Sequence, residues 1–289
     1  MSLLKGQDMI GLVRFNDVSA RPADVLLELT PGGDGSPGTG KAEAQAKLTP
    51  ANLNPSGNTS IGAGILLGTD VLDSAAAQSR AIVVLTDGIQ NTAPDIPEAT
   101  AVVTAKTPRQ RVFAVGLGLH QLEDKLHQIA SVTGGVAQIT GELVGYKEFL
   151  LQKLYVQILA DVSDEAFVTD PREMVPPGGQ SATDVYLGEV DVAADFIVAF
   201  RETRVFPKYM EVWLEAPDGT TLAPADVAGI PTGEFVRGRG HLYFRLAFPA
   251  SPEGHIGRWR VWVRNLSGHH GEEDEETAVG MGREALYYS

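Results

Sequence analysis

The chain has 289 residues, of which 43% are hydrophobic and 21% are charged, so it can bury a sizeable core and wholesale disorder is excluded. At roughly 150 residues per domain, this length predicts about two domains. The sequence contains no cysteine, which excludes disulfides, thiolate metal sites and cysteine nucleophiles.

Two further classes of partner are disfavoured by composition. No stretch reaches the roughly 18 consecutive apolar residues that a membrane span needs, and the start of the chain lacks the apolar run of a secretion signal, so we expect a soluble chain whose compartment stays open. The net charge is −14: residues 1–160 carry 12 basic and 15 acidic side chains, whereas residues 161–289 carry 11 and 22. Because the acidic second half would repel a phosphate backbone, we do not expect nucleic acid as a partner.

The first half of the sequence alternates short β-rich runs with helical patterns, which is typical of βαβ units. Apolar positions recur at helical spacing from Leu122 to Ala130 and from Leu151 to Ile158. The predicted strands are Met9–Phe15, Val25–Leu29, Ala81–Thr86, Val112–Leu117 and Val136–Thr140. We therefore predict an α/β domain over residues 1–160, with a doubly wound, mostly parallel sheet.

The second half of the sequence changes to a period of two. Apolar and polar residues alternate along Met210–Glu215, Leu242–Phe248 and Arg258–Arg264, as expected for half-buried antiparallel strands. We therefore predict an all-β antiparallel sandwich over residues 161–289. Its predicted interior side chains are Met210, Leu214, Phe244, Phe248, Trp259 and Val261.

Polar residues that follow the strands of a doubly wound sheet are the first candidates for a site, because ligands bind outside the carboxyl ends of such strands. Asp87 directly follows an apolar run, and Thr59 lies where a Gly-containing loop enters a helix. A carboxylate and a hydroxyl at one sheet edge suit a hard cation such as Mg²⁺. Taken one at a time, each residue is better explained by a local role, Thr59 or Ser60 as a helix cap and Asp87 as part of a turn.

Taken together, these segments resemble the von Willebrand factor type A domain. Four segments occur in the order expected for that family over roughly residues 1–160, namely Asp8–Phe15, Gly57–Gly64, Ile82–Gly88 and Val112–Gly118. The resemblance implies a metal-ion-dependent adhesion site that takes an Asp-x-Ser-x-Ser motif from one loop, a threonine from a second and an aspartate from a third. Thr59 matches the threonine and Asp87 matches the aspartate.

The first element of that site is missing from the sequence, which has no Asp-x-Ser-x-Ser motif. The resemblance places the strand that precedes this motif between Met9–Phe15 and Ala81–Thr86, so the chain is expected to begin after it. An empty position there would leave backbone groups unpaired. Three alternatives follow: the segment is absent, another segment takes its place, or the two neighbouring strands close up.

A rival interpretation comes from Gly35–Lys41, which fits the Gly-x-x-x-x-Gly-Lys part of a phosphate-binding loop and predicts a nucleotide hydrolase. Position 42 is alanine, so the hydroxyl that would bind Mg²⁺ is missing, and five residues separate the loop from the preceding strand. We expect instead a mobile loop that binds no nucleotide.

The preferred hypothesis is a binding protein without enzymatic activity. The resemblance implies protein–protein adhesion or scaffolding, in which a divalent cation completes its shell with a carboxylate of the partner protein. With only Thr59 and Asp87 as ligands, we expect Mg²⁺ or another divalent cation to bind weakly or not at all.

Overall fold

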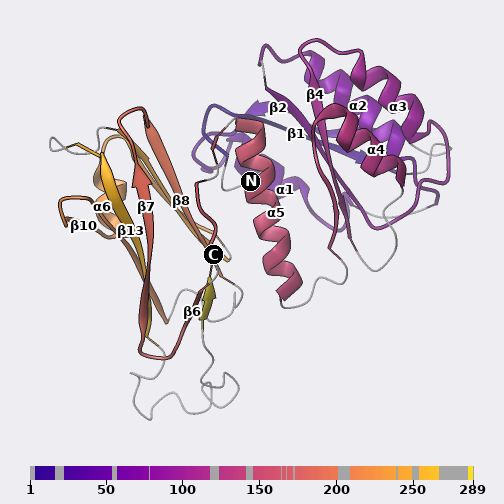
Figure 1. Ribbon diagram of the computed structural model, residues 1–289. Helices are drawn as coiled ribbons and strands as arrows, with labels where there is room; N and C mark the ends of the chain where they lie inside the picture. The colour runs from indigo at the N-terminus through magenta and orange to yellow at the C-terminus, as the bar shows by residue number, and fades with distance from the viewer. Residues whose placement is uncertain are drawn as a thin grey trace. The chain divides into compact units, whose positions relative to one another are not determined.

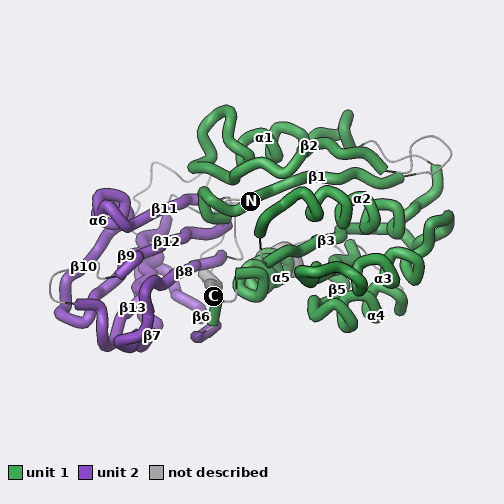
Figure 2. The backbone as a smooth tube through the Cα atoms, turned by 90° about the horizontal axis from the view of Figure 1, so that it is seen from above, with its two compact units in different colours: residues 1–166 green, residues 167–289 purple. Residues whose placement is uncertain are grey.

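A computed structural model describes residues 4–16, 23–53, 57–77, 79–117, 124–140, 146–163, 165–166, 168–171, 173–200, 209–238, 240–248, 254–266 and 286–288. The chain divides into two compact units, Met1–Ala166 and Phe167–Ser289, which are coloured green and purple in Figure 2. Among the described helices, none is long and apolar enough to cross a membrane. Each unit is described by itself below.

Unit 1 contains a parallel sheet of three strands. These are β3 (Arg80–Thr86), β4 (Gln110–Gly116) and β5 (Ala137–Ile139), in the order β3-β4-β5. The predicted parallel sheet is therefore present. Its strands β3 and β4 carry continuous apolar runs, as expected where helices cover both faces of a sheet.

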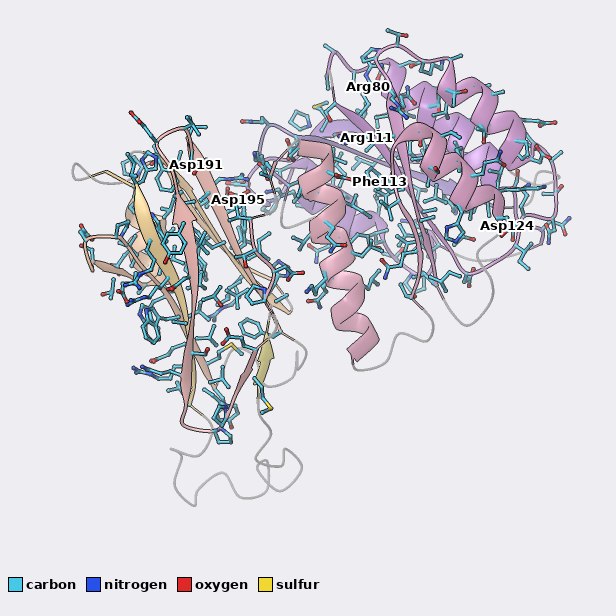
Figure 3. The ribbon with its side chains drawn as sticks, viewed as in Figure 1. Arg80, Arg111, Phe113, Asp124, Asp191 and Asp195 are labelled. Atoms are coloured by element: carbon cyan, nitrogen blue, oxygen red, sulfur yellow. The ribbon has the colours of Figure 1, made fainter. Side chains whose placement is uncertain are left out.

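Helices cover both faces of this sheet (Figure 1). Three of them, α2 (Ile61–Asp73), α3 (Ile96–Thr104) and α4 (Asp124–Thr133), share a core with one face. On the other face, α5 (Tyr146–Ser163) packs on Phe113 and Val115 of β4, and Figure 3 shows Phe113 beneath this helix.

The first two strands form a separate sheet. β1 (Met9–Phe15) and β2 (Ala23–Pro31) pair antiparallel, and α1 (Gly40–Lys47) packs against them. Among the described residues, β1 pairs only with β2, and β3 pairs only with β4. The alternative in which β1 and β3 close up is therefore wrong, because no hydrogen-bonded ladder joins them.

Unit 2 is built from antiparallel sheets. One has the order β10-β9-β13-β7 and a second has the order β11-β12-β8, while β6 pairs with β14. The only helix in the described part of this unit is the short α6 (Pro224–Gly229). The strands are β6 (Glu173–Val175), β7 (Gln180–Leu187), β8 (Ala193–Ala199), β9 (Met210–Glu215), β10 (Thr221–Leu222), β11 (Gly233–Arg237), β12 (His241–Ala247), β13 (Gly257–Asn265) and β14 (Leu286–Tyr288).

One core lies between the two larger sheets of unit 2. It combines residues of β7, β9 and β13 with residues of β8 and β12. Because side chains alternate between the faces of a strand, each strand sends every second side chain into this core. Of the six predicted interior side chains, Phe248 is partly buried against the core and the others are buried, namely Met210, Leu214, Phe244, Trp259 and Val261.

Candidate functional site

The two residues singled out by the sequence lie in adjacent loops of unit 1. Asp87 is the first residue after β3 and is exposed, and Thr59 lies two positions before the start of α2 and is half-buried. The hydroxyl Oγ1 of Thr59 lies 3.3 Å from the position that a Cβ atom would take on Gly88. The threonine hydroxyl therefore lies beside Gly88, the residue directly after Asp87.

Asn91 connects these two loops. Its side-chain Oδ1 accepts a hydrogen bond of 2.7 Å from the backbone N–H of Thr59, and its own backbone N–H donates to the carbonyl oxygen of Thr59 at 3.1 Å. Two hydrogen bonds between the same pair of residues fix both their separation and their relative rotation. The backbone of Thr59 is thus held by the loop that follows β3.

Gln90 makes a second connection between the loop after β3 and the start of α2. Its Oε1 accepts a hydrogen bond of 3.0 Å from the backbone N–H of Gly62, while its Nε2 donates to the carbonyl oxygens of Thr92 and Pro94. The backbones of Gly62 and Pro94 lie close together. A Cβ on Gly62 would lie 2.3 Å from the carbonyl oxygen of Pro94, so only glycine fits there.

The turn at Asp87 is shaped by its neighbour rather than by its own carboxylate. The hydroxyl of Thr86 accepts a hydrogen bond of 3.2 Å from the N–H of Gly88 and lies 3.1 Å from the carbonyl oxygen of the same residue. Because Thr86 makes the local bonds, the exposed carboxylate of Asp87 is not needed for the turn.

Sequence reasoning missed Gln90 and Asn91, although both follow the Asp-Gly pair closely. The signal that could have found them is two adjacent side-chain amides after the end of a predicted strand, because such amides satisfy backbone groups in loops. Their partners lie about 30 residues earlier in the chain.

The donor set at this site is small. Within the part of the chain that the structure describes, no group of three or more His, Asp or Glu side chains lies together. Asp87 offers one carboxylate and Thr59 one hydroxyl, both oxygen donors of the kind that Mg²⁺ takes, although Mg²⁺ needs six. The residues present therefore fit a cation that keeps most of its water or takes oxygens from another molecule.

The loop Gly35–Lys41 is bonded to itself and to Gly32, just after β2. The N–H of Lys41 donates to the carbonyl oxygen of Gly32 at 3.0 Å, and the N–H of Thr39 donates to that of Ser36 at 3.1 Å. Lys41 is only 7% exposed, and its Cε lies 3.6 Å from where a Cβ would stand on Gly32. A lysine packed in this way does not offer its charge to a phosphate at the loop.

Comparison with known proteins points to one family. Residues 4–142 match the family model of the von Willebrand factor type A domain. No curated protein matches the chain. The family match gives no support to the nucleotide hydrolase.

Two of the solved structures that match this chain are the following. The von Willebrand factor type A protein from Catenulispora acidiphila is 15% identical, with a TM-score of 0.43 over 93% of this chain and 52% of that one. Proximal thread matrix protein 1 from the mussel byssus is 17% identical, with a TM-score of 0.36 over 58% of this chain and 38% of that one. The chain thus spans about half the length of the first protein and less of the second.

The order of elements agrees with the family match. The matched residues run from before β1 to just after β5, so they contain both sheets of unit 1 together with α1 to α4. The β-rich unit 2 follows them. Residues 4–142 of this chain therefore match the von Willebrand factor type A domain over both sheets of unit 1.

Proposed function

We propose that this chain is a protein-binding module, and that Thr59 and Asp87 form a partial metal-ion-dependent adhesion site. Type A domains are in general interaction modules rather than enzymes, which supports the first part of the proposal. The second part is supported by one observation: the hydroxyl of Thr59 lies 3.3 Å from the position that a Cβ atom would take on Gly88, the residue next to Asp87. In this proposal unit 1 is the doubly wound sheet of the family, and unit 2 is an antiparallel sandwich.

The chemistry of the site is electrostatic. Asp87 would supply the negative charge and Thr59 a neutral oxygen, while Asn91 and Gln90 hold the threonine loop in place. A cation held there would keep open positions, and a carboxylate from a partner protein would fill one of them. The bound cation would thus bridge two carboxylates that would otherwise repel each other.

The binding of a cation by this chain alone is expected to be weak. One carboxylate and one hydroxyl leave most of an octahedral shell to water. The site also lies near the start of α2, and the partial positive charge of a helix N-terminus disfavours a cation. A partner's carboxylate is therefore required for tight assembly.

Calorimetric titration with Mg²⁺ and with Mn²⁺ tests the proposal. We expect weak binding by the natural sequence, and no binding by Asp87→Asn or Thr59→Val. The matched control is Asp70→Asn, which removes an exposed carboxylate from α2 and should bind the cation as the natural sequence does. Unchanged binding in Asp87→Asn would show that the site has been misassigned.

A further inference from the structure

The outer face of the sheet β10-β9-β13-β7 in unit 2 carries a pair of tryptophans. Trp262 of β13 is in register with Trp213 of β9, and their rings are nearly parallel, with an angle of 4° and a centroid distance of 5.7 Å. Both rings are half-buried, although they lie on the face opposite the core. An aromatic ring that is held in one orientation and still partly exposed can stack on a ligand.

A small residue lies on the other side of Trp262. Its neighbour in register on β7 is Ala182, which is half-exposed. Gln180 and Asp184 lie two positions away on either side of Ala182, on the same face of β7 and about 13 Å apart along the strand. Ala182 therefore leaves room beside the Trp262 ring, between two longer polar side chains. We call Gln180, Ala182, Asp184 and Trp262 the Trp262 surface.

Arginines of β13 hold the two polar side chains of this surface. Oε1 of Gln180 accepts hydrogen bonds of 3.3 and 3.1 Å from Nε and Nη2 of Arg264, and Oδ1 of Asp184 accepts one of 3.3 Å from Nε of Arg260. Nε2 of Gln180 donates to none of the described residues. Oδ2 of Asp184 lies 4.0 Å from Nη1 of Arg258, which is too far for a hydrogen bond. The Trp262 surface thus offers a donor at one end and an acceptor at the other.

The charges on this outer face cancel. It carries three arginines and three carboxylates, each in an ion pair with another of the six, namely Arg258, Arg260, Arg264, Asp184, Glu211 and Glu215. Residues 161–289 carry 22 acidic and 11 basic side chains, so unit 2 repels an anion. A cation would have to compete with an arginine for each of these three carboxylates. The charge pattern therefore favours a neutral ligand with several hydrogen-bonding groups.

We propose that the Trp262 surface binds one ring of a neutral oligosaccharide. A pyranose ring whose hydroxyls are all equatorial has two flat faces of C–H groups, and these hydrogens are attracted to the negative face of an aromatic ring. Its hydroxyls both donate and accept hydrogen bonds. Such a ring can stack on Trp262 while it accepts from Gln180 and donates to Asp184. This binding needs no metal ion and is separate from the candidate site in unit 1.

Calorimetric titration of the whole chain with cellohexaose tests this proposal. Cellohexaose is a neutral β-1,4-linked glucose oligomer whose rings have only equatorial hydroxyls. We expect saturable binding, accompanied by a change in tryptophan fluorescence. The matching oligomer of β-1,4-linked glucuronic acid has the same ring and linkage but a carboxylate on each ring, so it should bind at least tenfold more weakly.

Two variants separate stacking on Trp262 from nonspecific binding. Trp262→Ala removes the ring, and Ala182→Leu fills the room beside it while all three tryptophans of the sequence remain. Each should weaken cellohexaose binding at least tenfold. The matched control is Ala225→Leu, the same change at an exposed position of α6, which should leave binding unchanged. Thermal unfolding of each variant checks that it is folded.

A third variant tests the hydrogen-bond donor. Gln180→Glu keeps an oxygen that can accept from Arg264 but replaces the donor amide by a second oxygen. It should weaken cellohexaose binding at least threefold without loss of stability, because the new carboxylate pairs with the arginine. A purely structural role of Gln180 would leave binding unchanged.

Four results would overturn the proposal: no saturable binding of cellohexaose, equal binding by Ala182→Leu, tighter binding of the glucuronic acid oligomer, or a dimer in sedimentation that Trp262→Ala dissociates. The last would show that a second copy of the chain covers this face. The cation titration with Asp87→Asn is independent of all four, so the Trp262 surface and the metal site can fail separately.

Discussion

The two units of this protein use β-strands in opposite ways. In unit 2 the core strands β9 and β13 alternate buried with more exposed positions, so each sheet needs a cover on one face only, and the facing sheet provides it. In unit 1 the strand β3 is continuously apolar from Ala81 to Leu85 and needs neighbours on both faces. In unit 2 the two larger sheets share one core, so each sheet covers the apolar face of the other. In the described part of unit 1, β3 pairs with a strand along one edge only.

The difference also appears in where the exposed apolar side chains of the described residues lie. Exposed apolar side chains in unit 2 lie singly in loops or on outer faces, as on most protein surfaces. In unit 1 two of them, Val83 and Leu85, lie on β3, which pairs along one edge only within the described residues. Substitutions in the core of unit 2 should therefore cost more stability than substitutions at the unpaired edge of β3.

The largest effect is expected in the closed core of unit 2. Trp259 is 2% exposed and packs on Phe196 and Phe248, with ring centroids 5.8 Å away in each case. Trp259→Ala should lower the free energy of unfolding of this unit by about 4 kcal/mol, because it leaves a cavity. All three tryptophans of the sequence lie in unit 2, so fluorescence of the remaining two reports on this unit alone.

The control for that change is a tryptophan of the same strand on the opposite face. Trp262 is half-buried, stacks on Trp213 at a centroid distance of 5.7 Å and donates from Nε1 to Glu215 at 2.7 Å. Trp262→Ala should cost about 1 kcal/mol, since it removes a surface contact and one hydrogen bond. Equal losses in the two variants would contradict the assignment of the inner face.

The second prediction compares neighbouring residues on one face of the open sheet. Val115→Ala removes buried methyl groups from β4 and should cost about 2 kcal/mol. Val83→Ala removes the same groups from the exposed edge of β3 and should cost less than about 1 kcal/mol. Denaturant unfolding followed by exchange of β4 amides measures both, and a larger loss at Val83 would mean that the edge is covered in solution.

Much of this architecture could be predicted from the sequence, because it follows from local patterns. β1 has the predicted bounds Met9–Phe15, and the alternation along Arg258–Arg264 gave the correct inner face of β13. The unpaired edge of β3 could be predicted only from the absence of the Asp-x-Ser-x-Ser motif, because the resemblance places the strand before that motif next to β3. Whether β1 and β3 close up depends on how α2 packs on both strands through Gly64 and Gly68, which no local pattern records.

The candidate site was predictable only in part, for a similar reason. Thr59 and Asp87 stand out because each lies at a junction between predicted elements. The side chains of Asn91 and Gln90 each accept one hydrogen bond from a backbone N–H about 30 residues away. Two adjacent amides after a strand indicate a loop that satisfies backbone groups, but only the fold shows which distant backbone groups these are.

The third prediction concerns pH and compares one buried tyrosine in each unit. Burial, and then the charge of Asp195, raise the pKa of Tyr243 in unit 2 well above its ordinary value, and burial raises the pKa of Tyr155 in unit 1. Below about pH 10 both residues are protonated in the folded and unfolded chain, so they add no pH dependence. Above it the unfolded chain loses these protons first, and stability falls as pH rises.

The expected slope is up to about 1.4 kcal/mol per pH unit for each tyrosine, as long as the folded form keeps its proton. Tyr243→Phe should remove this slope from the tryptophan-detected unfolding of unit 2 between about pH 10 and 11. Tyr155→Phe should leave that transition unchanged and act on unit 1 only. An identical pH profile for the natural chain and Tyr243→Phe would show that Tyr243 is not buried as described.

The smallest effect is expected at Asn91, whose side chain binds the backbone of Thr59 in the candidate site. Asn91→Ala removes the acceptor of the Thr59 N–H, and because Asn91 is exposed, water can replace it, so stability should fall by no more than about 1 kcal/mol. Asn91→Asp is the matched control, since it keeps an oxygen at the same position. If Asn91 positions the threonine, Asn91→Ala weakens Mn²⁺ binding while Asn91→Asp preserves it or strengthens it through the added negative charge. Weaker binding in both variants, or in neither, would mean that the hydrogen bond to Thr59 does not position a metal ligand, and calorimetric titration of the two variants side by side distinguishes these results.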